Sequence, residues 1–132
     1  MFLFLCLVLI TGGWNNAALK SAEIYNPVTK TSCSVPKLPE SRYEHREDGG
    51  LVCGGYGAKT SCVKWSPAFG NWTQSHTLRE DRYHHVSWVT ASGVYLIGGR
   101  DSKSTSEKVK LDGSVEEGFS LEYPTRFAYK LH

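Results

Sequence analysis

The sequence predicts an all-β fold of short antiparallel strands joined by tight turns. Its 132 residues contain 13 Gly, 7 Tyr, 5 Phe and 4 Trp, a composition that favours strands and turns and disfavours a helical bundle. At three places an apolar run of four or five residues ends in a glycine pair. At roughly 150 residues per domain, the length allows one domain and no second.

Charge and hydropathy exclude two classes of partner. The 15 Lys and Arg residues against 13 Asp and Glu leave a net charge of +2, so no strong field favours a nucleic acid or an anionic membrane surface. The longest apolar run, residues 1–10, has half of the roughly 20 residues that a membrane-spanning helix requires. We therefore expect no nucleic-acid partner and no membrane span.

Three markers recur at one period and predict a repeat protein. The first is the glycine pair, the second a strand-like segment that follows it, and the third an Arg-Tyr-x-His segment. Successive glycine pairs lie 42 and 44 residues apart, and the other markers keep step with them. The copies are Gly12-Gly13, Gly54-Gly55 and Gly98-Gly99; residues 21–27, 61–67 and 106–112; and residues 38–45 and 78–85, which end in the Arg-Tyr-x-His segment, with a fainter echo in residues 123–129.

Each unit of about 43 residues is expected to hold four strands. The first strand is predicted to begin at Arg42 or Arg82 and to end at a tight hairpin turn. The apolar run before the glycine pair is the second strand, and the strand-like segment is the third. Residues 31–35 and 71–74 supply the fourth. Four short strands in about 40–50 residues are the blade of a β-propeller.

These markers resemble the kelch repeat family, in which an apolar strand ends in Gly-Gly and an aromatic residue and a Trp follow. The matching residues are Gly54, Gly55, Trp65 and Trp72 in a unit that fits in full, Gly12, Gly13 and Tyr25 in one that fits in part, and Gly98 and Gly99 in one that fits less well. Arg42 with His45 and Arg82 with His85 match the Arg-x-x-His that opens a kelch blade. The resemblance implies that these four side chains lie inside the blades and hydrogen-bond between them.

The repeat boundaries predict about three blades of four-stranded antiparallel sheet in an incomplete ring. Propellers as a class need at least about four blades. Three interpretations therefore stay open: the chain is a fragment of a longer protein, it closes a six-bladed ring with a second copy, or it persists as an open arc that self-associates through exposed blade faces. The predicted units are residues 1–6 (the remnant of a signal peptide), 7–41 (a repeat without its first strand), 42–81, 82–125, and 126–132 (the start of a further blade).

The compartment is indicated by the N-terminus, the cysteines and one sequon. Residues 1–13 fit either a secretory signal or a buried strand. The four cysteines permit three pairings, and loss of Cys6 with a signal would leave Cys33, Cys53 and Cys62, one of them unpaired. Cys53 and Cys62 could face each other across a hairpin, or be buried reduced thiols. With a glycosylation sequon at Asn71, we expect an extracellular protein; a cytoplasmic one is the alternative.

Candidate chemical sites are few. The histidines invite a metal interpretation, but adjacent residues of a strand point to opposite faces, so His84 and His85 are not expected to share an ion, and His45 and His85 occupy equivalent repeat positions. We predict no metal site, no cofactor and no catalytic residue. The loops after the glycine pairs are the predicted partner-binding segments, with a solvated connector as the alternative. Their candidate residues are Trp14, Asn15 and Asn16, and Arg100, Asp101 and Lys103.

The resemblance implies a non-catalytic module that binds a protein through its blade-rim loops. Two alternatives belong to other classes. One is a fragment of a galactose-oxidase-like enzyme or of a carbohydrate-binding propeller, and the other is an intracellular kelch adaptor that lacks its BTB domain.

Overall fold

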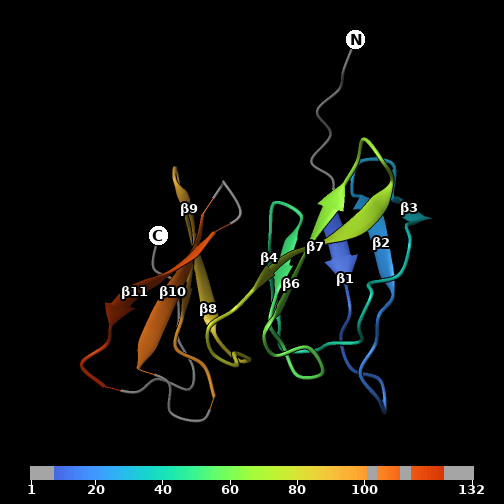
Figure 1. Ribbon diagram of the computed structural model, residues 1–132. Coiled ribbons are helices and arrows are strands. Elements are labelled where there is room, and N and C mark those ends of the chain that lie inside the picture. Colours follow the sequence, from blue (N-terminus) through green and yellow to red (C-terminus); the bar gives the residue numbers. More distant parts are fainter. Residues whose placement is uncertain (1–7, 101–103, 111–113, 124–132) are drawn as a thin grey trace.

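The computed structural model describes residues 8–100, 104–110 and 114–123, and this part of the chain contains eleven strands and no helix. The strands form three antiparallel sheets, and within each sheet every strand pairs with its neighbour in sequence. The three sheets stand side by side as an arc (Figure 1). The predicted all-β fold of about three blades in an unclosed ring is confirmed.

We call the sheets blades 1, 2 and 3. Blade 1 is a three-stranded sheet, and blades 2 and 3 are four-stranded. Blade 1 comprises β1 (Val8–Thr11), β2 (Ala22–Asn26) and β3 (Thr31–Ser34). Blade 2 comprises β4 (Arg46–Asp48), β5 (Leu51–Cys53), β6 (Ser61–Ser66) and β7 (Asn71–Thr77). Blade 3 comprises β8 (Val86–Thr90), β9 (Gly93–Ile97), β10 (Thr105–Lys110) and β11 (Val115–Ser120).

The first strands begin four residues later than the sequence predicts. β4 starts at Arg46 rather than Arg42, and β8 starts at Val86 rather than Arg82. The reason is that Glu44 and His84 have left-handed φ values of 59° and 56°, which interrupt an extended strand. His84 and His85 are therefore loop residues, and the strand argument used for them was wrong in its premise.

Two apolar clusters hold neighbouring blades together. Between blades 2 and 3, the buried side chains of Cys53, Cys62, Leu78, Leu96 and Val109 pack into one core. Between blades 1 and 2, a second core consists of Leu38, Val52 and Val63, with the partly buried Trp72 against it. The central strands are thus apolar on both faces, as expected for strands with a sheet on either side.

The outward faces of the two terminal blades carry exposed apolar residues. Val8 and Ile10 are exposed on β1 of blade 1, and Trp88 is exposed on β8 of blade 3. Among the described residues, no helix is long and apolar enough to span a membrane.

Candidate functional site

The glycine pairs build the rim of the arc from backbone contacts. The second glycine of a pair donates its N–H to the carbonyl of the arginine that opens the next blade, from Gly13 to Arg42 at 2.9 Å and from Gly55 to Arg82 at 2.8 Å. A Cβ on Gly54, the first of its pair, would lie 2.4 Å from the Arg82 carbonyl oxygen. Only glycine permits this approach, so each pair brings the next blade against the end of its strand.

The opening arginines fix the same rim from inside. Arg42 and Arg82 are buried. Arg42 Nη1 donates to the carbonyl oxygens of Gly54 and Ser61, at 3.0 and 2.8 Å, and Arg82 Nη1 makes the equivalent pair of bonds in blade 3. Because each arginine holds the ends of the second and third strands of its own blade, the residue after it is placed at the rim.

Four aromatic side chains meet at this rim. Trp14 follows a glycine pair, as does Tyr56, while Tyr43 and Tyr83 follow the opening arginines. Consecutive ring centroids lie 5.0 Å apart for Trp14 and Tyr43, 5.2 Å for Tyr43 and Tyr56, and 5.6 Å for Tyr56 and Tyr83. We call these four residues the aromatic row. It runs from blade 1 across blade 2 to blade 3.

The row is exposed at one end and anchored at the other. Trp14 is 61% exposed and Tyr56 is 45% exposed, whereas Tyr83 is buried. Tyr43 and Tyr56 are also tied through their backbones, with N–H···O bonds of 3.2 and 2.8 Å in the two directions. The exposed rings therefore stand on a rigid base.

Two cations lie over the rings near blade 3. The ammonium group of Lys59 is 4.8 Å from the centroid of the Tyr56 ring and 5.1 Å from that of Tyr83, and the Arg100 guanidinium is 5.9 Å from the Tyr83 centroid. Contacts of this kind contribute about 0.5–1 kcal/mol at exposed sites. Beside them, Nε2 of His84 lies 2.5 Å from a carboxylate oxygen of Glu44. The rim thus combines aromatic faces with groups of both charges.

Ionisation of His45 and His85 beneath the row, and of Tyr43 within it, is suppressed. Burial, followed by the charge of Arg42, lowers the pKa of His45 to about 4. Burial, followed by the charge of Arg46, lowers the pKa of His85 to about 3. Partial removal from water, followed by the charge of Glu44, raises the pKa of Tyr43. At neutral pH these three side chains are uncharged.

The predicted loop residues fall on this rim to different degrees. Trp14 belongs to the aromatic row, and Arg100 contacts it. Asn15 and Asn16 are exposed in the same loop as Trp14, and Asp101 and Lys103 lie outside the described residues. Sequence reasoning missed three members of the row, although Tyr56 directly follows a glycine pair and Tyr43 and Tyr83 lie within the Arg-Tyr-x-His marker.

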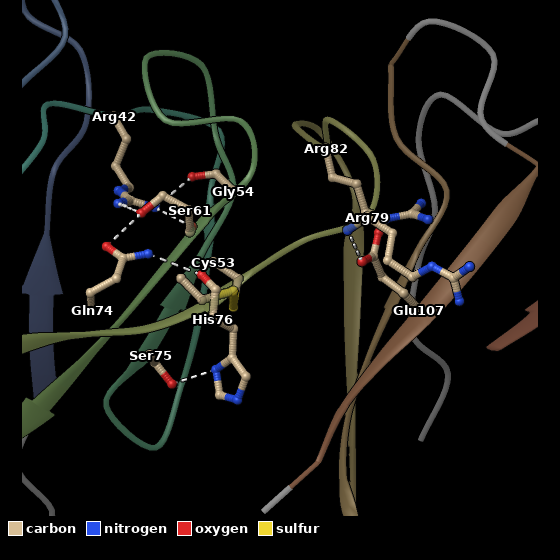
Figure 2. Close-up of a disulfide and its surroundings, with 11 residues drawn as sticks. Arg42, Cys53, Gly54, Ser61, Gln74, Ser75, His76, Arg79, Arg82 and Glu107 are labelled. Carbon is tan, nitrogen blue, oxygen red and sulfur yellow. Dashed lines mark hydrogen bonds and ion pairs between the residues drawn. A yellow bond between two sulfur atoms is a disulfide. The ribbon is translucent and has the colours of Figure 1, made fainter. Parts of the chain in front are cut away.

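A disulfide lies between blades 2 and 3, below the rim (Figure 2). Cys53 and Cys62 are direct partners in the β5–β6 register, with their Cα atoms 4.2 Å apart. Among the described cysteines, Cys33 is free and exposed on β3; Cys6 lies outside the described part. Asn71, the predicted glycosylation site, is exposed at the start of β7.

The repeat tryptophans join blade 2 to the segment before it. The Trp65 and Trp72 rings are 5.4 Å apart, and Trp72 Nε1 donates to the Pro36 carbonyl at 2.7 Å. Tyr25, at the position equivalent to Trp65, is partly buried on β2. Across the ranges that the structure describes, no three His, Cys, Asp or Glu side chains gather as metal ligands would.

Three meandering sheets, with glycine pairs and buried arginines repeated at each junction, define a repeat protein built of β-propeller blades. A family model of the kelch motif matches residues 6–39, and no curated protein matches the chain. The three strands of blade 1 thus lie within a segment that matches the kelch motif.

Proposed function

We propose that this chain is a non-catalytic protein-binding module that holds its partner on the aromatic row. The observation that carries the proposal is the continuity of four rings across three blades, with Trp14 and Tyr56 exposed. Tryptophan, tyrosine and arginine are the residues that most often supply the energy of protein interfaces, and Arg100 stands at the buried end of the row.

The rigidity of the rim supports the same function. Backbone hydrogen bonds from Gly13 and Gly55 hold the loops against the next blade, so binding would cost little ordering of the main chain. Surfaces ordered in advance retain more of their contact energy as affinity. Kelch repeats are in general non-catalytic scaffolds, which agrees with a binding role.

A peptide-display selection on the immobilised protein tests the proposal. We expect selected peptides to bind at least 10-fold more weakly, about 1.4 kcal/mol, to a Trp14→Ala, Tyr56→Ala variant. The control is Phe69→Ala, because Phe69 is 82% exposed in the β6–β7 turn at the opposite rim. Equal losses in both variants would contradict the proposal. Binding of glycans instead of peptides, abolished by Tyr56→Ala, would replace it with the carbohydrate-binding alternative.

We also propose that the protein works outside the cell. The Cys53–Cys62 disulfide supports this location, because disulfides persist in oxidising compartments. Alkylation of the native protein without reductant should label Cys33 and leave Cys53 and Cys62 unlabelled. A protein recovered from a secretory host should lose mass on enzymatic removal of N-glycans, and Asn71→Gln should abolish that loss. Labelling of Cys53 and Cys62 would favour the cytoplasmic alternative.

A further inference from the structure

A cleft lies between blades 2 and 3, at the rim opposite the aromatic row. Its volume is about 320 Å³, which is within the size range of small-molecule sites. Both walls belong to four-stranded blades, whose first strands β4 and β8 lie side by side (Figure 1). Asp48 and Gly93 place the cleft at the β4–β5 and β8–β9 turns, far from the glycine pairs. We call it the interblade cleft.

The wall that blade 3 contributes to the cleft is apolar. Val94 pairs with Val89 on one side and with Val109 on the other, so the three side chains form one cross-strand row on the same face of the sheet. All three line the cleft. Val94 and Val109 also belong to the apolar core between the blades, whereas Val89 is 53% exposed. This valine row therefore continues the core into the cleft.

The wall that blade 2 contributes carries opposite charges at its two ends. Leu51 pairs with Asp48 on one side and with Lys64 on the other, and these three residues line the cleft opposite the valine row. Two steps between paired strands put the two charged residues about 10 Å apart, with the leucine between them. The wall therefore offers a carboxylate, an apolar centre and an ammonium group, in that order.

The two charges of this wall are available to a ligand. Lys110, at the edge of the cleft, lies 3.6 Å from a carboxylate oxygen of Glu116 and is held by it. By contrast, no ion pair joins Asp48 or Lys64 to any other residue that the structure describes. Lys64 is exposed and Asp48 is partly exposed, so neither group must be taken out of water before it can meet a ligand.

The order of groups along the cleft defines the chemistry that it can recognise. The complement of the blade 2 wall is a molecule with an ammonium group at one end, a carboxylate at the other and an apolar body between them. A peptide of this length would lay its amide groups against the valine row without hydrogen-bond partners, which is costly, so the body is a methylene chain. At roughly 30 Å³ for each water-sized group, the cleft holds about ten such groups.

We propose that the interblade cleft binds an aliphatic zwitterion, an ω-amino carboxylate whose two charges lie about 10 Å apart. Its ammonium group pairs with Asp48, its carboxylate pairs with Lys64, and its methylene chain lies between Leu51 and the valine row. Because the ligand contacts both walls, it bridges blades 2 and 3, and its binding stabilises the folded chain by mass action. The site is separate from the aromatic row and does not depend on a protein partner.

Titration of the full chain with ω-aminooctanoate, followed by NMR of the valine methyl groups, tests the proposal. We expect saturable shifts of the Val89, Val94 and Val109 signals. Octanoate lacks the ammonium group and octylamine lacks the carboxylate, so each should bind at least about 3-fold more weakly than the zwitterion. The absence of saturable shifts at these valines, or equal affinities for the three compounds, would overturn the proposal.

Two variants that each remove one charge separate the two ends of the site. Lys64→Gln should lower the affinity for ω-aminooctanoate to that for octylamine and leave octylamine binding unchanged. Asp48→Asn should lower it to the affinity for octanoate and leave octanoate binding no weaker. The matched control is Lys37→Gln, because Lys37 is exposed outside the cleft, and it should change none of the three affinities. Unchanged selectivity in Lys64→Gln or in Asp48→Asn would contradict the assigned orientation and overturn the proposal.

The Trp14→Ala, Tyr56→Ala variant separates the cleft from the aromatic row. It should bind ω-aminooctanoate as tightly as the unmodified chain does, because its substitutions lie at the other rim. Loss of ω-aminooctanoate binding in this variant would place the ligand on the aromatic row and overturn the cleft site. Peptide binding by the row is measured without the zwitterion, so failure of the cleft site leaves the proposed function standing.

Discussion

The two junctions between blades have the same backbone hydrogen bonds. They differ in the side chains that surround the buried arginine, Arg42 at the junction of blades 1 and 2 and Arg82 at that of blades 2 and 3. Arg82 donates one hydrogen bond from Nε to Glu107 at 2.7 Å and another from Nη2 to Glu80 at 3.0 Å. At the position equivalent to Glu107, blade 2 has the buried Val63, and Arg42 Nε has no hydrogen-bond partner in the described part of the chain. Burial lowers the pKa of Arg42. Two carbonyl oxygens and the Ser61 hydroxyl therefore hold the first arginine without a carboxylate.

The histidines of the two junctions differ in the same way. His45 Nε2 and Thr11 Oγ1 are 3.0 Å apart and share a hydrogen bond. The equivalent of Thr11 in blade 2 is Cys53, whose sulfur is bonded to Cys62 in the disulfide (Figure 2). Both ring nitrogens of His85 consequently lack a hydrogen-bond partner among the described groups. The comparison teaches that backbone geometry is kept from junction to junction while the side-chain partners are not.

Replacing Glu107 should produce the largest change. Glu107→Val gives blade 3 the residue that blade 2 uses, but it removes the buried carboxylate from Arg82 and leaves only the partly exposed Glu80 as its ion-pair partner. Breaking a buried pair in this way costs about 3–5 kcal/mol, measured as the free energy of unfolding in denaturant. The reciprocal variant Val63→Glu serves as the comparison. A loss below about 1 kcal/mol in Glu107→Val would show that Arg82, like Arg42, needs no carboxylate at this position.

Replacing the first glycine of a pair should cause the second largest loss of stability. Gly54→Ala places a Cβ 2.4 Å from the Arg82 carbonyl oxygen at a φ of +67°, and we expect a loss of about 3 kcal/mol from clash and strain together. Gly70→Ala is the matched control, since its φ is +65° with nothing within 4 Å, and it should cost about 1 kcal/mol. Equal losses in the two variants would mean that the cost comes from the left-handed φ alone and not from the contact between Gly54 and the next blade.

The disulfide should contribute somewhat less. Cys53→Ala with Cys62→Ala should lower the free energy of unfolding by about 2–3 kcal/mol, as expected for a short closed loop. Cys53→Thr with Cys62→Ala reproduces the Thr11–Ala22 pair of blade 1 and gives His85 a hydroxyl partner. That variant should recover about 1 kcal/mol. Identical stabilities for the two double variants would refute the equivalence of the junctions.

The smallest expected effect is the loss in free energy of unfolding for each unit by which the pH is lowered. The folded-state pKa values of His45 and His85, about 4 and about 3, lie below the ordinary 6.5, so below pH 6.5 the unfolded chain binds protons that the folded chain does not. Stability is full above pH 6.5, and each histidine removes about 1.4 kcal/mol per pH unit as the pH falls toward its folded-state pKa. His85→Gln should reduce the slope by that amount. An unchanged slope between pH 6 and pH 4 would contradict the shift.

The sequence was sufficient for the fold but not for the candidate site. The glycine pairs and apolar runs predicted the blades because both signals are local. The aromatic row depends on contacts between blades, and Tyr56 meets Tyr83 only through backbone bonds that Gly55 makes to Arg82. The first strands were placed too early because Glu44 adopts a left-handed φ that nothing in its residue type indicates.

The hydrogen bond from the second glycine of each pair to the next blade makes the rim modular. The main chain sets the angle between blades at Gly13 and Gly55, so this angle does not depend on the side chain that follows the pair. The chain already places a tryptophan, a tyrosine and an arginine there, at Trp14, Tyr56 and Arg100. Substitutions at these three positions can therefore change the binding specificity one residue at a time, by evolution or by design, without repacking the blades below.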